Sequence, residues 1–140
     1  MAKMGQFTMA ADRLHRILVV DDEKDAASTL AEILEADGHQ TLAVNDGPAA
    51  LTVLQTFEPD VVLLDLGLPE MDGYEVATRL REQDRDRQIL LIAVTGYQSD
   101  MARLKQAGFD RYLMKPPNLR KLDALLAEWD SGTTEDRRST

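Results

Sequence analysis

The sequence predicts one α/β domain built on a doubly wound parallel sheet. Short apolar runs alternate with amphipathic stretches five times along the chain. Three of these runs are almost continuously hydrophobic, which is typical of strands covered by helices on both faces. Strands that alternate with helices at this spacing form right-handed βαβ units. The five expected strands are Arg16–Val20, Gln40–Val44, Val61–Leu64, Ile89–Val94 and Arg111–Met114.

The stretches between the first three strands have helical periodicity. The first places Leu30, Ile33 and Leu34 on one face and stops at Gly38, a residue suited to a left-handed cap. The second is closed by Pro59. Its apolar positions are Ala50, Val53, Leu54 and Phe57.

Three further helices are expected in the second half of the chain. The third is marked by Tyr74, Ala77 and Leu80. The fourth covers about Ser99–Ala107, is weakly apolar and stops at Gly108. The fifth begins at an Asn118 cap. Its apolar positions are Leu119, Leu122, Leu125, Leu126 and Trp129.

Five parallel strands predict a flavodoxin-like sheet with strand order 2-1-3-4-5, counted along the chain. Ligands of such sheets bind at the carboxyl ends of the strands. The domain is expected to span residues 15–130, with an N-terminal tail over 1–14 and a small, polar, flexible C-terminal tail over 131–140. We therefore expect no second domain and no DNA-binding module.

The composition argues against several classes of protein. Without cysteine there is no disulfide, thiolate metal site or thiol nucleophile, which fits a reducing cytoplasm as the expected location. No apolar run approaches the ~20 residues of a membrane helix. A net charge of −9 argues against a nucleic-acid partner. The acidic excess either only aids solubility or belongs in part to a carboxylate cluster that binds a cation.

Carboxylates follow two of the buried strands. Asp21 and Asp22 come directly after the first strand, and Asp65 comes directly after the third. The first and third strands are neighbours in the expected order, so the three side chains should converge at one edge of the sheet. Crowded carboxylates repel unless some are protonated or a cation joins them. Oxygen ligands suit Mg²⁺ better than zinc.

A hydroxyl and an ammonium group are expected at the same edge. Thr95 directly follows the fourth expected strand, and Lys115 directly follows the fifth. Together with a cation these groups can stabilise a phosphoryl group during transfer. Asp65 would be the nucleophile and would form an aspartyl phosphate.

Four segments carry a resemblance to a known family. They are Ile-Leu-Val-Val-Asp21-Asp22, Leu-Leu-Asp65-Leu-Gly-Leu-Pro-Glu-Met-Asp-Gly, Val-Thr95-Gly and Met-Lys115-Pro. In this order, at these strand ends, they resemble the receiver domain of two-component response regulators, and the chain from Arg16 to about Asp130 looks like a single-domain, chemotaxis-regulator-like member.

The resemblance implies a role for each site residue. Asp65 would be phosphorylated, and Mg²⁺ would be bound directly by Asp22, Asp65 and the Gly67 carbonyl, with Asp21 assisting through water. Thr95 and Lys115 would contact the phosphoryl oxygens.

The same resemblance implies a conformational readout. Gly96 would leave the pocket open, Thr95 and Tyr112 would form the switch, and the Lys115–Pro116 bond would be cis. The changed surface would comprise the fourth helix, fifth strand and fifth helix. It carries Met101, Arg103, Lys105, Arg111, Arg120 and Lys121.

The implied function is a phosphoacceptor response regulator in a two-component or phosphorelay system. The donor would be a phosphohistidine on a histidine kinase or a histidine phosphotransfer protein, and the output a downstream protein partner. His15 and His39 lack the sequence context of donor histidines. The protein would be a monomer or a weak phosphorylation-dependent dimer, and would catalyse only its own phosphorylation and dephosphorylation.

Simpler interpretations exist for the individual residues. Asp21, Asp22 and Glu23 alone would suit a helix N-cap cluster. Asp65 alone could be a turn residue, and partial burial alone would explain Tyr112. Asp72 and Gly73 are interpreted only as the turn and start of the third helix.

Other functions fit the sequence less well than a receiver does. An aspartyl-phosphate phosphatase of the haloacid dehalogenase type requires an aspartate two residues after the nucleophile, where this chain has Gly67. A flavin or nucleotide carrier would need a phosphate-binding loop where acidic residues stand. A degenerate receiver would lack an acidic position or the lysine. A receiver from a hybrid histidine kinase has the same chemistry, and the ends of the sequence favour a free-standing protein.

Overall fold

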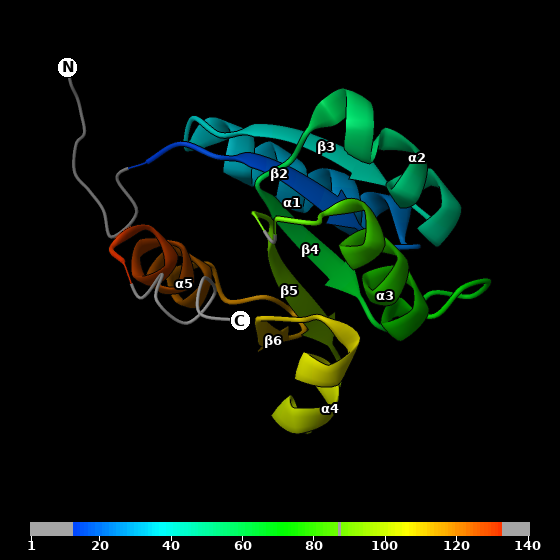
Figure 1. Cartoon of the computed structure of the whole chain (residues 1–140). Coiled ribbons are helices and arrows are strands. Elements are labelled where there is room, and N and C mark those ends of the chain that lie inside the picture. The colour runs from blue at the N-terminus through cyan, green and yellow to red at the C-terminus, as the bar shows by residue number, and fades with distance from the viewer. Residues whose placement is uncertain (1–12, 87, 133–140) are drawn as a thin grey trace, which may run out of the picture.

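The computed structural model describes residues 13–86 and 88–132, in which strands and helices alternate along the chain (Figure 1). The strands are β2 (Arg16–Val20), β3 (Gln40–Val44), β4 (Val61–Asp65), β5 (Leu90–Thr95) and β6 (Arg111–Met114). The helices are α1 (Lys24–Ala36), α2 (Gly47–Phe57), α3 (Gly73–Gln83), α4 (Met101–Ala107) and α5 (Leu119–Asp130). The predicted tails, 1–14 and 131–140, lie mostly outside the described residues.

The strands form one parallel sheet in the order β3-β2-β4-β5-β6. Counted along the chain this is 2-1-3-4-5, which confirms the predicted order and fold class. The register pairs Val20 with Leu64 and Asp65 with Val94. Because every strand runs the same way, the residues that follow β2, β4, β5 and β6 meet at one edge of the sheet.

Alternate residues of each strand enter one of two cores. In β4, Val61 and Leu63 belong to the core under α1 and α5, whereas Val62 and Leu64 belong to the core under α2, α3 and α4. All five β4 residues are buried, as its continuous apolar run predicts. Figure 1 shows the helices on both sides of the sheet. The sheet, packed on both faces, therefore holds the residues at its carboxyl edge in fixed positions relative to one another.

Two predicted starts differ from the structure for identifiable reasons. Strand β5 begins at Leu90 because the Ile89 amide donates to an Asp84 carboxylate oxygen (3.1 Å). Helix α4 begins at Met101 because Asp100 caps it by accepting from the Ala102 amide. Helix α2 ends before Pro59, as predicted, and its C-cap residue Glu58 lies in the left-handed region (φ 54°).

The face expected for Leu30, Ile33 and Leu34 is only partly buried. Leu34 is buried and Leu30 is half-buried, but Ile33 is 39% exposed. The buried contacts of α1 instead include Ala27 and Ala31. Small residues on the core side let α1 lie close to the sheet and leave Ile33 at the border of a surface groove.

A buried histidine cluster fastens α5 at the opposite, amino edge of the sheet. The His15 ring lies between Asp60 and Asp130, with Nδ1 3.2 Å and Nε2 3.1 Å from a carboxylate oxygen of each. Because both ring nitrogens face acceptors, the charged imidazolium satisfies both. The His15 amide donates to Nδ1 of His39, which keeps that ring neutral.

This cluster predicts a pH-dependent stability. Burial lowers the pKa of His15, but the hydrogen bonds and charges of Asp60 and Asp130 outweigh it, so the pKa rises above 6.5. Charged His15 therefore stabilises the fold fully below pH 6.5, and this stability is lost as pH rises through the higher folded-state pKa. Burial and the neighbouring His15 lower the pKa of His39. Protonation of His39 therefore costs stability as the pH falls.

We expect a His15→Gln variant to lose the alkaline decline in the free energy of unfolding. Urea titrations at a series of pH values from 6.5 upward would measure it. A His39→Gln variant is the control, since it should keep that decline and change only the acid side. An unchanged alkaline slope in His15→Gln would contradict the assignment.

Candidate functional site

Three carboxylates converge where β2 and β4 end. Asp21, Asp22 and Asp65 each offer a carboxylate oxygen, and these oxygens lie within 4.8 Å of one another. Asp65 is buried, being 3% exposed, Asp21 is half-buried and Asp22 is exposed. The predicted acidic trio is therefore brought together, with its innermost member on the central strand.

Lys115 and Thr95 complete the edge. The Lys115 ammonium donates to Asp65 Oδ2 at 2.9 Å, and its backbone amide donates to the Thr95 carbonyl at 2.7 Å. The buried Thr95 hydroxyl oxygen accepts from the Tyr97 amide at 3.2 Å. The other Asp65 oxygen, Oδ1, accepts from the Gly67 amide at 2.9 Å. Asp65 is thus oriented from both sides by groups that the sequence places at the strand ends.

The neighbouring charges shift the pKa values of two side chains in this cluster, Asp21 and Lys115. Burial raises the pKa of Asp21, and the neighbouring carboxylates Asp65 and Asp22 act in the same direction. The Glu23 amide and Lys115 oppose this increase without cancelling it. Burial lowers the pKa of Lys115, but its hydrogen bond to Asp65 and the attraction of the three carboxylates raise it overall. Lys115 is therefore held as a cation in an acidic cluster.

The helix-cap interpretation of the acidic run does not hold. The N-cap of α1 is Glu23, whose side chain makes no capping hydrogen bond. The Asp21 carboxylate instead accepts from the Glu23 amide at 2.9 Å, which turns the chain after β2. No capping hydrogen bond from Asp22 is seen among the described residues. Neither Asp21 nor Asp22 therefore caps α1, and both belong to the carboxylate cluster with Asp65.

A cleft opens above Asp65. It has a volume of about 840 Å³ and is lined by residues after β2, β4, β5 and β6, together with the first turns of α3 and α4. The Gly96 position is open, since a Cβ there would meet nothing within 4 Å. The outer wall includes Tyr74 and Arg103, whose guanidinium carbon lies 4.2 Å from the Tyr74 ring centre. Sequence reasoning missed this wall because it depends on how α3 packs beside α4.

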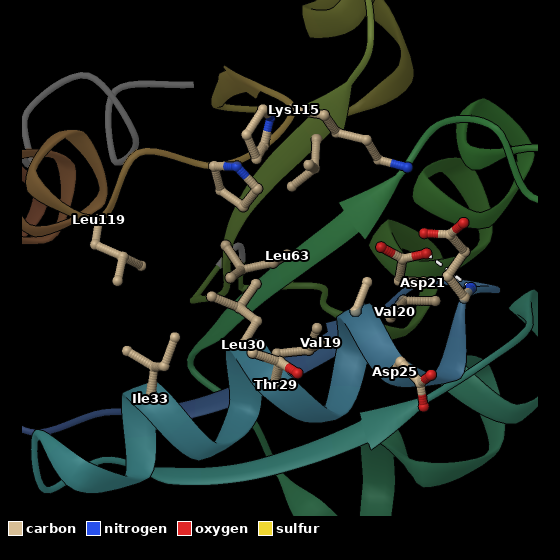
Figure 2. A pocket seen from close by; sticks show the side chains of 15 residues that line it. Val19, Val20, Asp21, Asp25, Thr29, Leu30, Ile33, Leu63, Lys115 and Leu119 are labelled. Carbon is tan, nitrogen blue, oxygen red and sulfur yellow. Dashed lines mark hydrogen bonds between the residues drawn. The ribbon is translucent and has the colours of Figure 1, made fainter.

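A second groove of about 670 Å³ runs between α1 and the segment that enters α5. Figure 2 shows Leu63 and Val19 on its floor and Ile33 and Leu119 at its far end. Its other end reaches Asp21 and Lys115, so the two hollows share part of their lining. The groove is mainly apolar, unlike the acidic cleft beside it.

The two remaining expectations concern β6 and the residues after it. Tyr112 is half-buried and packs at the border of the core under α2, α3 and α4. The Lys115–Pro116 peptide bond is cis, as the resemblance implied.

Across the described residues, no helix combines the length and apolarity needed to cross a bilayer.

Similarity to curated proteins agrees with this geometry. The chain is 33% identical over 102 residues to the polar-differentiation response regulator DivK of Brucella anthropi, covering 71% of this chain and 83% of that protein. It is 36% identical to the alkaline phosphatase synthesis transcriptional regulatory protein PhoP of Bacillus subtilis, with 78% of this chain and 45% of PhoP aligned. The chain thus spans less than half of PhoP.

Solved structures show the same fold. A CheY-like receiver domain protein of Methanospirillum hungatei superposes with a TM-score of 0.74 at 30% identity, covering 85% of this chain and 98% of that one. The Vibrio cholerae chemotaxis protein CheY4 superposes with a TM-score of 0.76 at 25% identity, covering 83% and 98%. Residues 17–127 match the family model described as the response regulator receiver domain. The chain therefore belongs to the receiver domain family of two-component response regulators.

Proposed function

We propose that this receiver domain accepts a phosphoryl group on Asp65 from a phosphohistidine and signals through the surface formed by α4, β6 and α5. One observation carries the proposal. The Lys115 ammonium lies 2.9 Å from Asp65 Oδ2, inside a carboxylate cluster whose oxygens lie within 4.8 Å of one another. A cation beside a nucleophilic carboxylate can neutralise the phosphoryl oxygens that approach it.

The residues present fit a magnesium ion. The ligand set consists only of oxygens, and three close carboxylates gain from a bound cation because it offsets their repulsion. In this proposal Asp22, Asp65 and the Gly67 carbonyl bind Mg²⁺ directly and Asp21 through water. The bound ion would supply positive charge to the phosphoryl oxygens.

The transfer itself requires little from the protein beyond orientation and charge. The phosphorus–nitrogen bond of the phosphohistidine breaks while a carboxylate oxygen of Asp65 forms a bond to phosphorus. The electron pair stays on the imidazole, which takes up a proton from solvent. Lys115 remains beside the transferred group, and the Thr95 hydroxyl donates to one of its oxygens. The domain thus catalyses only its own phosphorylation and dephosphorylation.

The donor histidine has to reach a buried carboxylate, so a donor protein must cover the cleft. A histidine kinase or a histidine phosphotransfer protein meets this requirement. The apolar groove between α1 and the segment that enters α5 offers contact area for such a protein, because it shares Glu23 and Lys115 with the cleft. Exposed Ile33 lies at its border.

Phosphoryl uptake from a small donor tests the chemistry without the partner. With Mg²⁺ and acetyl phosphate, we expect the chain to gain a single phosphate that is acid-stable and base-labile, as an acyl phosphate should be. Intact-mass spectrometry before and after mild base would measure it, with a chelator as the control. Uptake that is indifferent to the chelator, or a product stable to base, would contradict the proposal.

The readout is proposed to pass from Thr95 to Tyr112. A phosphoryl group adds roughly −1.5 to −2 charges and new acceptor oxygens, which favour inward movement of the Thr95 hydroxyl. Tyr112 is half-buried and pairs with Ala93, two residues before Thr95 on β5 and therefore on the same face of the sheet, so its ring can fill the space that Thr95 vacates. Phosphorylation would then bias an existing equilibrium. The basic residues of this surface favour an acidic partner or a weak dimer.

Chemical-shift mapping with Mg²⁺ and beryllofluoride, a phosphoryl mimic, tests this switch. We expect shifts at Asp65, Thr95 and Tyr112 and across α4, β6 and α5, with α2 silent. A Thr95→Ala variant should confine the shifts to the Asp65 pocket. Wild-type shifts that stop at the pocket would refute the switch and leave phosphorylation intact.

The phosphatase alternative has little support at this site. In that mechanism a second carboxylate two residues after the nucleophile donates and accepts protons. Here that residue is Gly67, and its amide is bonded to Asp65. A free-standing regulator and a receiver from a larger protein would share the proposed chemistry.

A further inference from the structure

The first residue of α3 lies unusually close to the proposed phosphoacceptor. A Cβ added to Gly73 would lie 2.7 Å from the Leu66 Cα, 2.8 Å from the Asp65 carbonyl oxygen and 2.9 Å from Leu66 Cδ2. Two of these three atoms belong to the backbone, so no rotamer change would remove the conflict. Gly73 is buried, and its φ does not fall in the left-handed region. A glycine is required here because there is no room for a side chain, and not because the backbone adopts a conformation that only glycine favours.

This contact closes the loop that leaves β4. The Gly73 amide donates to the Leu66 carbonyl at 3.2 Å, and the Leu66 amide donates to the Val94 carbonyl at 3.1 Å. Asp72 caps α3 by accepting from the Glu75 amide at 2.9 Å. The loop 67–72 is therefore fixed at its start by β5 and at its end by α3.

The same loop carries the groups proposed to bind the metal. Asp65 and Gly67 are joined by the hydrogen bond from the Gly67 amide to Asp65 Oδ1 (2.9 Å). Any displacement of the Asp65–Leu66 backbone would move the carboxylate and the Gly67 carbonyl together. Asp21 and Asp22 come from another strand and would not move with them.

We propose that Gly73 is a positioning residue, whose lack of a side chain sets the Asp65–Gly67 backbone in the geometry that binds Mg²⁺. The inference rests on the proposed function, and it gives Gly73 a role beyond starting a helix. A methyl group at this position should push α3 and the Asp65–Leu66 backbone apart. Misplaced ligands typically weaken metal binding by about 10- to 100-fold.

A Gly73→Ala variant tests the proposal against a matched control. A Cβ at Gly47 would lie 2.7 Å from Val76 Cγ2 and 3.2 Å from Met71 Cβ, so Gly47→Ala crowds the same helix with a methyl group. Its neighbours are side chains, and none belongs to the acidic cluster. Both variants should lose stability, but only Gly73→Ala should lose affinity for Mg²⁺.

Calorimetric Mg²⁺ titration and thermal unfolding without metal would be measured for wild type and both variants. We expect about a 10- to 100-fold weaker affinity in Gly73→Ala and wild-type affinity in Gly47→Ala. Wild-type affinity in Gly73→Ala, or equal losses in both variants, would overturn the positioning role while leaving the proposed function intact. A wild-type chain that does not bind Mg²⁺ would refute both.

A measurement on the wild type keeps the proposal testable if Gly73→Ala does not fold. In an NMR titration with Mg²⁺, the Gly73 amide should shift with the same midpoint as the Gly67 amide, because both are bonded to the Asp65–Leu66 segment. A Gly73 amide that stays silent while Gly67 shifts would overturn the role.

Discussion

A Lys115→Ala variant is expected to take up phosphoryl groups from acetyl phosphate about 10²- to 10³-fold more slowly than the wild type. The Lys115 ammonium is bonded to Asp65 Oδ2 and is attracted by Asp21 and Asp22. Without this ammonium, the carboxylates would repel the incoming phosphoryl oxygens more strongly, because one neutralising positive charge would be missing. The rate of mass gain at saturating Mg²⁺ measures the effect.

Two further variants separate charge from geometry. Lys115→Arg keeps the charge but presents a planar fork in place of a compact ammonium, so only partial recovery is expected. Lys121→Ala removes an exposed lysine from α5, outside the cleft, and should react at the wild-type rate. A Lys115→Ala rate within a few-fold of the wild type would contradict the role of Lys115.

The largest loss of stability is expected from Arg81→Met. The Arg81 guanidinium donates to Asp84 at 2.7 Å, to Asp110 at 2.8 Å and to the carbonyls of Ile89 and Gly108 at 2.9 and 2.8 Å. The three charged side chains are 8–11% exposed. Methionine fills a similar volume but leaves two largely buried carboxylates without this cation, which costs about 3–5 kcal/mol.

Arg79→Met is the control for this loss. Arg79 pairs with Glu75 at 3.0 Å on the exposed face of the same helix, and such pairs contribute about 0.2–1 kcal/mol. Urea unfolding would compare the two variants. The Arg81 network lies at the amino edge of the sheet, so Mg²⁺ affinity should not change in Arg81→Met. Equal losses in the two variants would contradict this account of the network.

The sequence predicted the site because the strands that carry it are buried on both faces. The apolar runs before Asp21 and Asp65 fix where the strands end, and a parallel sheet then brings both ends to one edge. The strand order and the juxtaposition of Asp21, Asp22 and Asp65 are confirmed. The roles given to these residues stay predictions.

The features that sequence reasoning missed all depend on contacts between elements far apart in the chain. Arg81 contacts residues up to 29 positions away, and His15 contacts Asp130, 115 positions away. Gly73 was interpreted as a helix start because its spacing is that of a turn. Its close approach to Leu66 depends on how α3 packs against the end of β4, which no local pattern encodes.

Chemical identification of the phosphorylated residue is the most direct test of the central claim. After reaction with acetyl phosphate and Mg²⁺, borohydride reduces an aspartyl phosphate to homoserine, which tandem mass spectrometry locates in the peptide sequence. We predict homoserine at position 65 alone, and no product in an Asp65→Asn variant. Homoserine at Asp21 or Asp22, a phosphohistidine at His15 or His39, or full labelling of Asp65→Asn would contradict the claim.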